Sequence, residues 1–201
     1  MMNHEISLEL FGPFKWRELF SQPKASERGV YLWTAPYKGQ FLVYYVGETG
    51  GVKRPKSFAR RFVEHTQHQL NGVWGICDSS EFVKGHKKYV WQGSENPTKV
   101  VEFLERYYEL SKAAIDFLEV IQIFLIPMND VDEPTRKRVE ALIAMALYNK
   151  ERVTQDFQDE NLFSRSNPQS YQRVWKSVAR NKKPIKFFLK MLKKYLDYQM
   201  N

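Results

Sequence analysis

The sequence predicts an α+β domain with a small, mostly antiparallel sheet. Two neighbouring runs, 30–34 and 41–46, are rich in aromatic and β-branched residues, which is typical of a hairpin. A later run, Leu118 to Ile126, is apolar on both faces and lies between two helical stretches, which favours a central strand. The chain of 201 residues, 43% of them hydrophobic, is long enough to bury one core. This mixed order of strands and helices is typical of α+β folds.

The N-terminal extension, residues 1–27, is expected to hold a short strand and a short helix. Ile6 to Leu10 alternates apolar and polar residues, which indicates the strand, and the helix is expected near Lys15 to Phe20. In the hairpin that follows, Pro36-Tyr37-Lys38-Gly39 supplies the turn. The main domain is predicted over residues 28–169.

A loop and a capped helix follow the hairpin. Glycine and proline keep Glu48 to Pro55 out of regular structure. Ser57 is a suitable N-cap for a helix that ends near Leu70. The segment 71–96 is rich in glycine, lysine and aromatic residues and is expected to be an insertion with one strand near Lys87 to Gln92.

Two further helices flank the apolar strand. Pro97 is expected to start a helix that runs to about Ala114. Asp132 can cap a second helix that ends near Asn149. The apolar side of the first helix is predicted to contain Val100, Val101, Leu104, Tyr107 and Tyr108.

The C-terminal part is predicted to be a loop over residues 151–169 and a basic helical extension over residues 170–201. Ile185 to Leu196 has an amphipathic pattern, with apolar residues on one face and lysines on the other. This helix could hold a nucleic-acid backbone, or its lysines could simply be solvated.

Composition predicts an intracellular, cytoplasmic protein. The single cysteine, Cys77, cannot form an internal disulfide or a thiolate zinc site. No apolar stretch is long enough for a membrane span, and residues 1–20 lack the order of a signal peptide. The net charge of +8 favours polyanionic partners without identifying one.

Arg61 and His65 are the first candidate site residues. They are four positions apart, so on a helix they share one face, at the edge of the stripe that contains Phe58 and Phe62. Such a face is often only solvated. An arginine fork can nevertheless hold phosphate oxygens as charge builds on phosphorus.

Glu140 is the second candidate because it is the only acid between Pro134 and Lys150 and lies beside an apolar stripe. A carboxylate in that position is costly unless it is paired or bound to a metal. Arg136, one turn earlier, is the alternative partner. A single carboxylate suits Mg²⁺, which keeps most of its hydration water.

Tyr31 and Tyr45, on the two hairpin strands, are the third pair of candidates. Tyrosines in strands are usually packing residues. A phenol can also orient a water molecule or act as a base, provided that nearby cations lower its pKa.

Four short motifs, in this order, resemble those of the GIY-YIG endonuclease family. They are Gly29-Val30-Tyr31, Tyr45-Val46-Gly47, Phe58 to His65 and Arg138-Val139-Glu140-Ala141. The resemblance covers residues 28–167 and implies a three-stranded sheet flanked by helices. It also implies hydrolysis of DNA phosphodiester bonds with Mg²⁺ or Mn²⁺.

The resemblance implies a role for each matching residue. Tyr31 and Tyr45 would line the site and place the attacking water, with Gly47 allowing the backbone to turn closely beneath it. Arg61 would stabilise the pentavalent phosphate, and His65 would assist by a hydrogen bond or proton transfer. Glu140 would hold one divalent metal ion.

An asparagine usually follows the glutamate helix in this family. Asn149, Asn161 and Asn167 compete for that position; Asn167 and Asn161 are preferred because they lie in the following loop, and Asn167 is taken as the site residue. The expected contacts to DNA are the basic residues Lys53, Arg54, Lys56, Arg60, Lys84, Lys87 and Lys88.

The leading hypothesis is a DNA endonuclease with a restriction, defence or mobile-element role. Its partner would be double-stranded DNA, and a homodimer would permit a double-strand cut. The alternative is an inactive nucleic-acid-binding module on the same fold.

Overall fold

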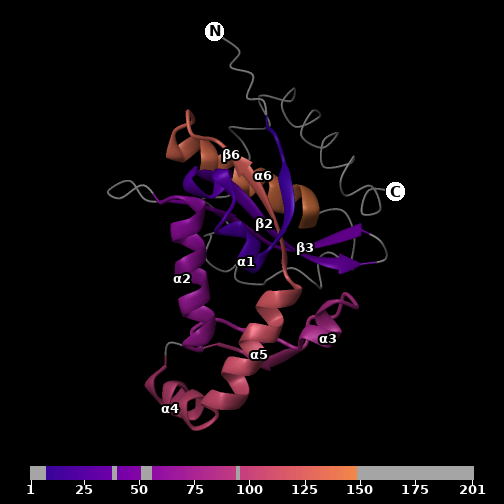
Figure 1. Cartoon of the computed structure of the whole chain (residues 1–201), viewed down its shortest axis with the longest axis vertical. Coiled ribbons are helices and arrows are strands. Elements are labelled where there is room, and N and C mark those ends of the chain that lie inside the picture. Colours follow the sequence, from indigo (N-terminus) through magenta and orange to yellow (C-terminus); the bar gives the residue numbers. More distant parts are fainter. Residues whose placement is uncertain (1–7, 38–39, 51–55, 94–95, 149–201) are drawn as a thin grey trace.

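A four-stranded antiparallel sheet forms the centre of the computed structural model, which describes residues 8–37, 40–50, 56–93 and 96–148. Helices cover both of its faces (Figure 1). The strands in spatial order are β1 (Phe11–Lys15), β6 (Gln122–Pro127), β2 (Gly29–Tyr37) and β3 (Gln40–Glu48). The prediction of an α+β fold with a mostly antiparallel sheet is confirmed.

The predicted number of three strands is wrong because the N-terminal segment joins the sheet. β1 pairs with β6, with Phe14 opposite Ile123. The expected strand at 6–10 lies instead at Phe11–Lys15, and residues 1–7 are outside the described part. The predicted short helix is present as α1 (Trp16–Leu19), whose Trp16 is buried in the core.

The predicted hairpin is confirmed as β2 and β3, and it contains a β-bulge. Trp33 pairs with Tyr45, and Thr34 pairs with Val43, so Tyr44 is an extra residue on β3. Strict alternation would send Tyr44 and Tyr45 to opposite faces. The bulge instead turns both rings toward the face that α2 and α5 cover.

Helix α2 (Phe58–Leu70) has the predicted bounds and the predicted cap. The Ser57 hydroxyl oxygen accepts a hydrogen bond from the Arg60 backbone N–H at 3.2 Å. Phe58 and Phe62 on one stripe of the helix are fully buried against Tyr31. This packing aims the following turn of α2, with His65, at the hairpin.

The single helix predicted over 97–114 is two helices, α4 (Pro97–Glu105) and α5 (Tyr107–Val120), separated at Arg106. α5 extends beyond the predicted end, so the strand expected from Leu118 starts only at Gln122 as β6. A continuous apolar run does not by itself distinguish a buried helix from a strand. Leu118 contributes to the core from α5.

The apolar side predicted for this region is wrong. Val100, Val101, Leu104, Tyr107 and Tyr108 are exposed, with Tyr108 at 91%. The buried side consists of Phe103, Leu110, Ala114 and Phe117. Both sets have helical spacing, and tertiary packing of the phenylalanines against Trp91, Tyr44 and Phe82 decides which is buried.

The segment expected to be an insertion, 71–96, forms a small two-stranded unit packed on α5. It contains β4 (Ile76–Cys77), α3 (Ser79–Phe82) and β5 (Tyr89–Trp91), and β5 confirms the predicted strand. Phe82 contacts Tyr44 and Phe117, which anchors the unit under the hairpin.

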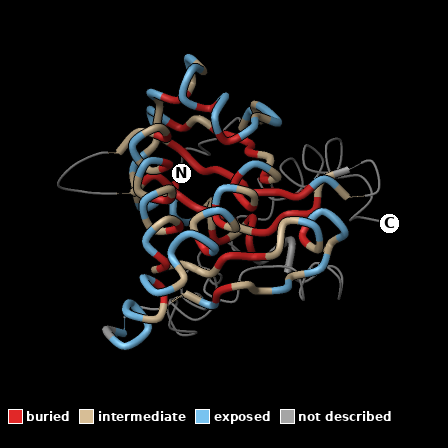
Figure 2. The backbone as a smooth tube through the Cα atoms, turned by 60° about the horizontal axis from the view of Figure 1, so that its bottom comes forward, coloured by how far each residue is buried: buried red, intermediate tan, exposed pale blue. Residues whose placement is uncertain are grey.

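Helix α6 (Glu133–Tyr148) covers the opposite face of the sheet with Ile143 and Ala144. The predicted cap is confirmed, because Asp132 Oδ1 accepts the Thr135 backbone N–H at 3.0 Å. The predicted loop and basic extension, 151–201, lie outside the described residues. Figure 2 shows that burial concentrates in the strands between the two helical layers. In the described part of the chain no helix is long and apolar enough to span a membrane.

Replacing neighbouring residues of α4 tests which side is buried. Phe103 is 2% exposed and Leu104 is 61% exposed. We expect Phe103→Ala to lower the free energy of unfolding by about 3–5 kcal/mol, since it leaves a cavity. We expect Leu104→Ala to change it by less than about 0.5 kcal/mol. Urea denaturation of both variants measures this, and similar losses would contradict the observed burial.

Candidate active site

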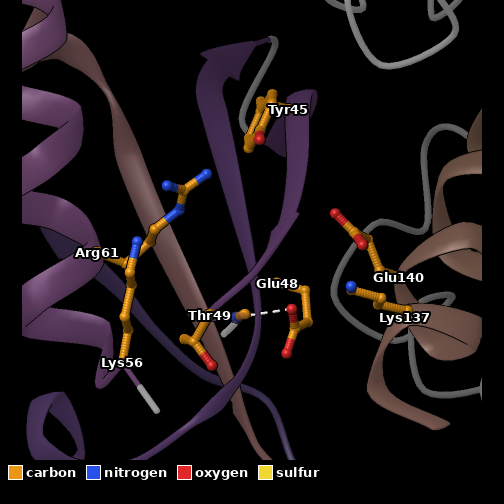
Figure 3. Close-up of a pocket in the computed structure, with 8 residues that line it drawn as sticks. Tyr45, Glu48, Thr49, Lys56, Arg61, Lys137 and Glu140 are labelled. Atoms are coloured by element: carbon orange, nitrogen blue, oxygen red, sulfur yellow. Dashed lines mark hydrogen bonds between the residues drawn. The ribbon is translucent and has the colours of Figure 1, made fainter. Parts of the chain in front are cut away.

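A pocket of about 300 Å³ lies at the C-terminal end of β3. α2 supplies one wall and α6 the other (Figure 3). The residues that line it are Tyr45, Glu48, Thr49, Gly50, Lys56, Arg61, Lys137 and Glu140. Because β3 is an edge strand, helices from the two opposite faces of the sheet can both reach this end. Three of the predicted catalytic residues therefore meet here, although up to 95 positions separate them in the sequence.

Gly47 makes room for the two tyrosine rings next to the pocket. A Cβ atom at this position would lie 2.4 Å from the Tyr31 hydroxyl and 2.6 Å from Tyr45 Cε1, which no side chain tolerates. The rings of Tyr31 and Tyr45 therefore pack across Gly47 with centroids 6.1 Å apart. Only glycine fits at this position of the second motif, because any side chain would collide with the two tyrosine rings.

Tyr31 lies behind the pocket and does not line it. It is fully buried, and its hydroxyl oxygen is 2.5 Å from Nε2 of the fully buried His65. Burial, together with the neighbouring Tyr45, raises the pKa of Tyr31 well above its ordinary value, although Arg61 opposes the shift. Burial also lowers the pKa of His65 well below its ordinary value. At neutral pH this pair is a protonated phenol and a neutral imidazole.

Glu64 binds the two basic side chains that line the pocket on the α2 side, Lys56 and Arg61. Its Oε2 accepts from Lys56 Nζ at 2.9 Å and from an Arg61 terminal nitrogen at 3.2 Å. Burial tends to raise the pKa of Glu64, but the bonds from Lys56 and Arg61 outweigh it and lower that pKa. Glu64 therefore stays anionic and fixes the direction of Arg61.

Glu140 is a largely buried carboxylate directed into the pocket from α6 (Figure 3). Burial and the neighbouring Glu48 raise its pKa to about 7, while Lys137 and Arg61 oppose the shift. No ion pair within the described residues includes Glu140. A desolvated acid beside a second acid favours a proton or a cation as its partner.

Glu48 and Arg136 form a buried ion pair that the sequence did not predict. Arg136 Nε donates to Glu48 Oε1 at 2.7 Å, and both side chains are less than a tenth exposed. Glu48 Oε2 also accepts the Gly50 backbone N–H at 2.6 Å. The alternative that Arg136 pairs with Glu140 is therefore wrong. The nearest sequence signal was an acid directly after the second glycine motif.

Lys137 and Trp74 are two further residues that sequence reasoning missed. Lys137 lies one turn before Glu140 on α6, lines the pocket and pairs with Glu133 at 2.7 Å. Trp74 reaches from the insertion to His65, with ring centroids 4.4 Å apart. The spacing of Lys137 from Glu140 could have indicated the first, whereas no local pattern indicates the second.

A divalent ion fits the pocket only as a mostly hydrated ion. The described residues contain no cluster of three or more histidine, cysteine or acidic side chains that could hold a metal. Glu48 already has Arg136 as its ion-pair partner, so Glu140 is the pocket carboxylate that is available to a metal ion. One carboxylate with water and phosphate oxygens satisfies Mg²⁺.

The other predicted DNA contacts have mixed locations. Arg60 is exposed at the start of α2, 3.6 Å from Glu64. Lys84 pairs with Glu81 near Gly85, which contacts Tyr37 close to the hairpin turn. Tyr37 pairs with Gln40 at the opposite end of β3 from Glu48, so Lys84 lies away from the pocket. Lys87 and Lys88, also in the insertion, do not line the pocket.

The remaining predicted residues lie outside the described part of the chain. They are Lys53, Arg54, Asn149, Asn161 and the preferred Asn167.

Comparison with known proteins identifies no relative. No family model, no curated protein and no solved structure matches this chain.

The raised pKa of Glu140 predicts a pH-dependent loss of stability. A carboxyl with a folded pKa near 7 and an unfolded pKa near 4.5 binds more protons when folded, so stability falls as pH rises between these values. Without divalent ions, we expect Glu140→Gln to gain stability over the wild type from pH 5 to 8, by up to about 3 kcal/mol. Urea denaturation in EDTA measures the difference, and parallel pH profiles would contradict it.

Two adjacent cations on α6 should differ sharply in their contribution to stability. Arg136→Met leaves the Glu48 carboxylate buried without its partner, so we expect a loss of about 3–5 kcal/mol. Lys137→Met, at a side chain 60% exposed, should change stability by less than about 0.5 kcal/mol. Thermal and urea unfolding measure both, and equal losses would show that the ion pair is not structural.

Proposed function

We propose that this protein is a metal-dependent endonuclease that hydrolyses DNA phosphodiester bonds. The observation that carries the proposal is the meeting of Tyr45, Arg61 and Glu140 in one pocket (Figure 3). They come from a strand and two helices on opposite faces of the sheet. A guanidinium can stabilise charge on phosphate oxygens, a desolvated carboxylate can hold a metal ion that polarises the phosphate, and a phenol can orient a water molecule.

Arg61 would bind the scissile phosphate. Glu64 fixes one side of its guanidinium, so the fork is oriented before a substrate arrives. Lys56 and Lys137 add positive charge on the two walls of the same pocket. These groups would stabilise the charge that builds on the non-bridging oxygens in the transition state.

Glu140 would hold the divalent ion on the opposite wall. A bound Mg²⁺ or Mn²⁺ would polarise the phosphate and stabilise the leaving oxygen. Glu48 supports this role, because its charge near Glu140 favours a cation in the pocket.

Tyr45 would orient the attacking water, since its ring faces the pocket and Tyr31 does not. Tyr31 keeps its proton and would act indirectly, by supporting Tyr45 across Gly47 and by contacting Arg61. The resemblance implied the same role for both tyrosines, whereas here Tyr45 would act directly on the water and Tyr31 would only support it.

The proposed substrate is double-stranded DNA, which suits the net charge of +8. One such pocket makes one nick, so a double-strand cut would require a homodimer or two events. A restriction, defence or mobile-element role fits a nuclease of this type.

Plasmid cleavage tests the proposal. With Mg²⁺ or Mn²⁺ we expect nicked and linear products, and with EDTA none. Arg61→Ala and Glu140→Gln should each lower the rate by at least about 10²–10³-fold, because each removes charge stabilisation from the transition state. Arg106→Ala, in the link between α4 and α5, and Glu105→Gln, at the end of α4, do not line the pocket; they are the matched controls and should keep wild-type rates.

Two results would overturn this assignment. Full metal-dependent cleavage by folded Arg61→Ala and Glu140→Gln would remove their proposed roles. Binding of DNA without cleavage under any metal condition would favour the inactive binding module instead.

A further inference from the structure

Within the described part of the chain, three buried polar atoms without a hydrogen-bond partner belong to residues of β2 and α2 at and around His65. Trp33 Nε1, His65 Nδ1 and Gln69 Oε1 have no hydrogen-bond partner among the described residues. Their residues are 1%, 0% and 2% exposed. Buried polar groups in native proteins are almost always paired with protein groups or with ordered water, because leaving one unpaired is costly.

The three atoms come from one interface between β2 and α2. His65 and Gln69 are one turn apart and are both on the buried face of α2. The ring of Trp33, from β2, faces the His65 ring at a centroid distance of 4.8 Å and an angle of 75°. Trp74 covers another side of the imidazole at 4.4 Å, so aromatic rings surround it.

The hydrogen-bonding capacities of the three atoms are complementary. An indole N–H only donates, an amide oxygen only accepts, and a neutral imidazole nitrogen does either, depending on its tautomer. One water molecule can accept from Trp33, donate to Gln69 and bond to His65. Two to four polar partners are what a buried water requires.

We propose that one buried water molecule, held by Trp33 and Gln69, binds His65 Nδ1 and fixes the imidazole against Tyr31. Trp33 and Gln69 are then positioning residues, as they act through His65. The network continues through the 2.5 Å contact between His65 Nε2 and the Tyr31 hydroxyl, and from there to Arg61 at the pocket. Its importance for catalysis rests on the proposed nuclease function.

NMR of the ¹⁵N-labelled wild-type protein, without metal or DNA, tests the hydration site directly. We expect the Trp33 indole proton to show cross-relaxation with a long-lived water, and the His65 ring nitrogens to report a single neutral tautomer. Absence of that water signal would overturn the proposal, as would a direct Trp33–Gln69 hydrogen bond that excludes water.

Gln69→Leu removes the acceptor at nearly constant volume. We expect it to abolish the water signal at Trp33 and to mix the two His65 tautomers. Gln67→Leu, two positions earlier on the exposed side of α2, is the matched control and should leave both signals unchanged. A Gln69→Leu protein that keeps the wild-type signals would contradict the assignment.

A cleavage assay separates this inference from the proposed function. If the protein is a nuclease, Gln69→Leu should lower the turnover rate about 10-fold at unchanged affinity for DNA, an order of magnitude typical of a misaligned supporting group. If the protein cuts nothing, the NMR result still decides whether the water is present. An unchanged turnover rate with the water lost would remove the positioning role.

Discussion

The buried ion pair between Glu48 and Arg136 is the interaction on which the pocket depends. It joins the end of β3 to the first turns of α6, and the same carboxylate also binds the Gly50 backbone. Glu140 lies one turn beyond Arg136, so the ion pair sets the distance between Glu140 and the wall formed by α2. The same pair places a second carboxylate near Glu140, and burial together with this neighbour raises the pKa of Glu140 to about 7. The ion pair therefore contributes to both the structure and the electrostatics of the pocket.

A second constraint acts on the other wall. The β-bulge at Tyr44 turns Tyr45 toward α2. Because Gly47 has no side chain, the rings of Tyr31 and Tyr45 can pack against each other there. Tyr31 then contacts His65, while Glu64 on the same helix directs Arg61. Tyr45 and Arg61, which face the pocket, are therefore supported by Tyr31 and Glu64, which do not line it. Such support is what keeps a site rigid enough for catalysis.

The sequence predicted local features well, but it predicted poorly which distant segments pair and which helix side is buried. The hairpin, the Ser57 cap, the helix that carries Arg61 and the Asp132 cap follow from residue chemistry within a few positions. A strand was predicted in the N-terminal extension, but its position and its place in the sheet were missed, because pairing of β1 with β6 depends on contacts across about 110 residues. The exposed side of α4 was mistaken for its core side, because two stripes with helical spacing compete and only tertiary packing selects one.

The same contrast between local and long-range prediction holds for the candidate site. Motif spacing was sufficient to name Tyr45, Arg61 and Glu140, which the fold brings together. It could not show that Tyr31 is buried behind the pocket, nor that Arg136 pairs with Glu48 and leaves Glu140 available. Those facts depend on register, on the bulge and on how α6 crosses the sheet.

Binding of Mn²⁺, followed by paramagnetic broadening in NMR spectra, tests the central claim most directly. If Glu140 holds a divalent ion, low Mn²⁺ concentrations should broaden first the signals of residues that line the pocket, including Glu48, Gly50 and Lys137. The effect should vanish in folded Glu140→Gln. Broadening centred elsewhere on the protein, or unchanged in that variant, would contradict the assignment of this pocket as a metal-dependent active site.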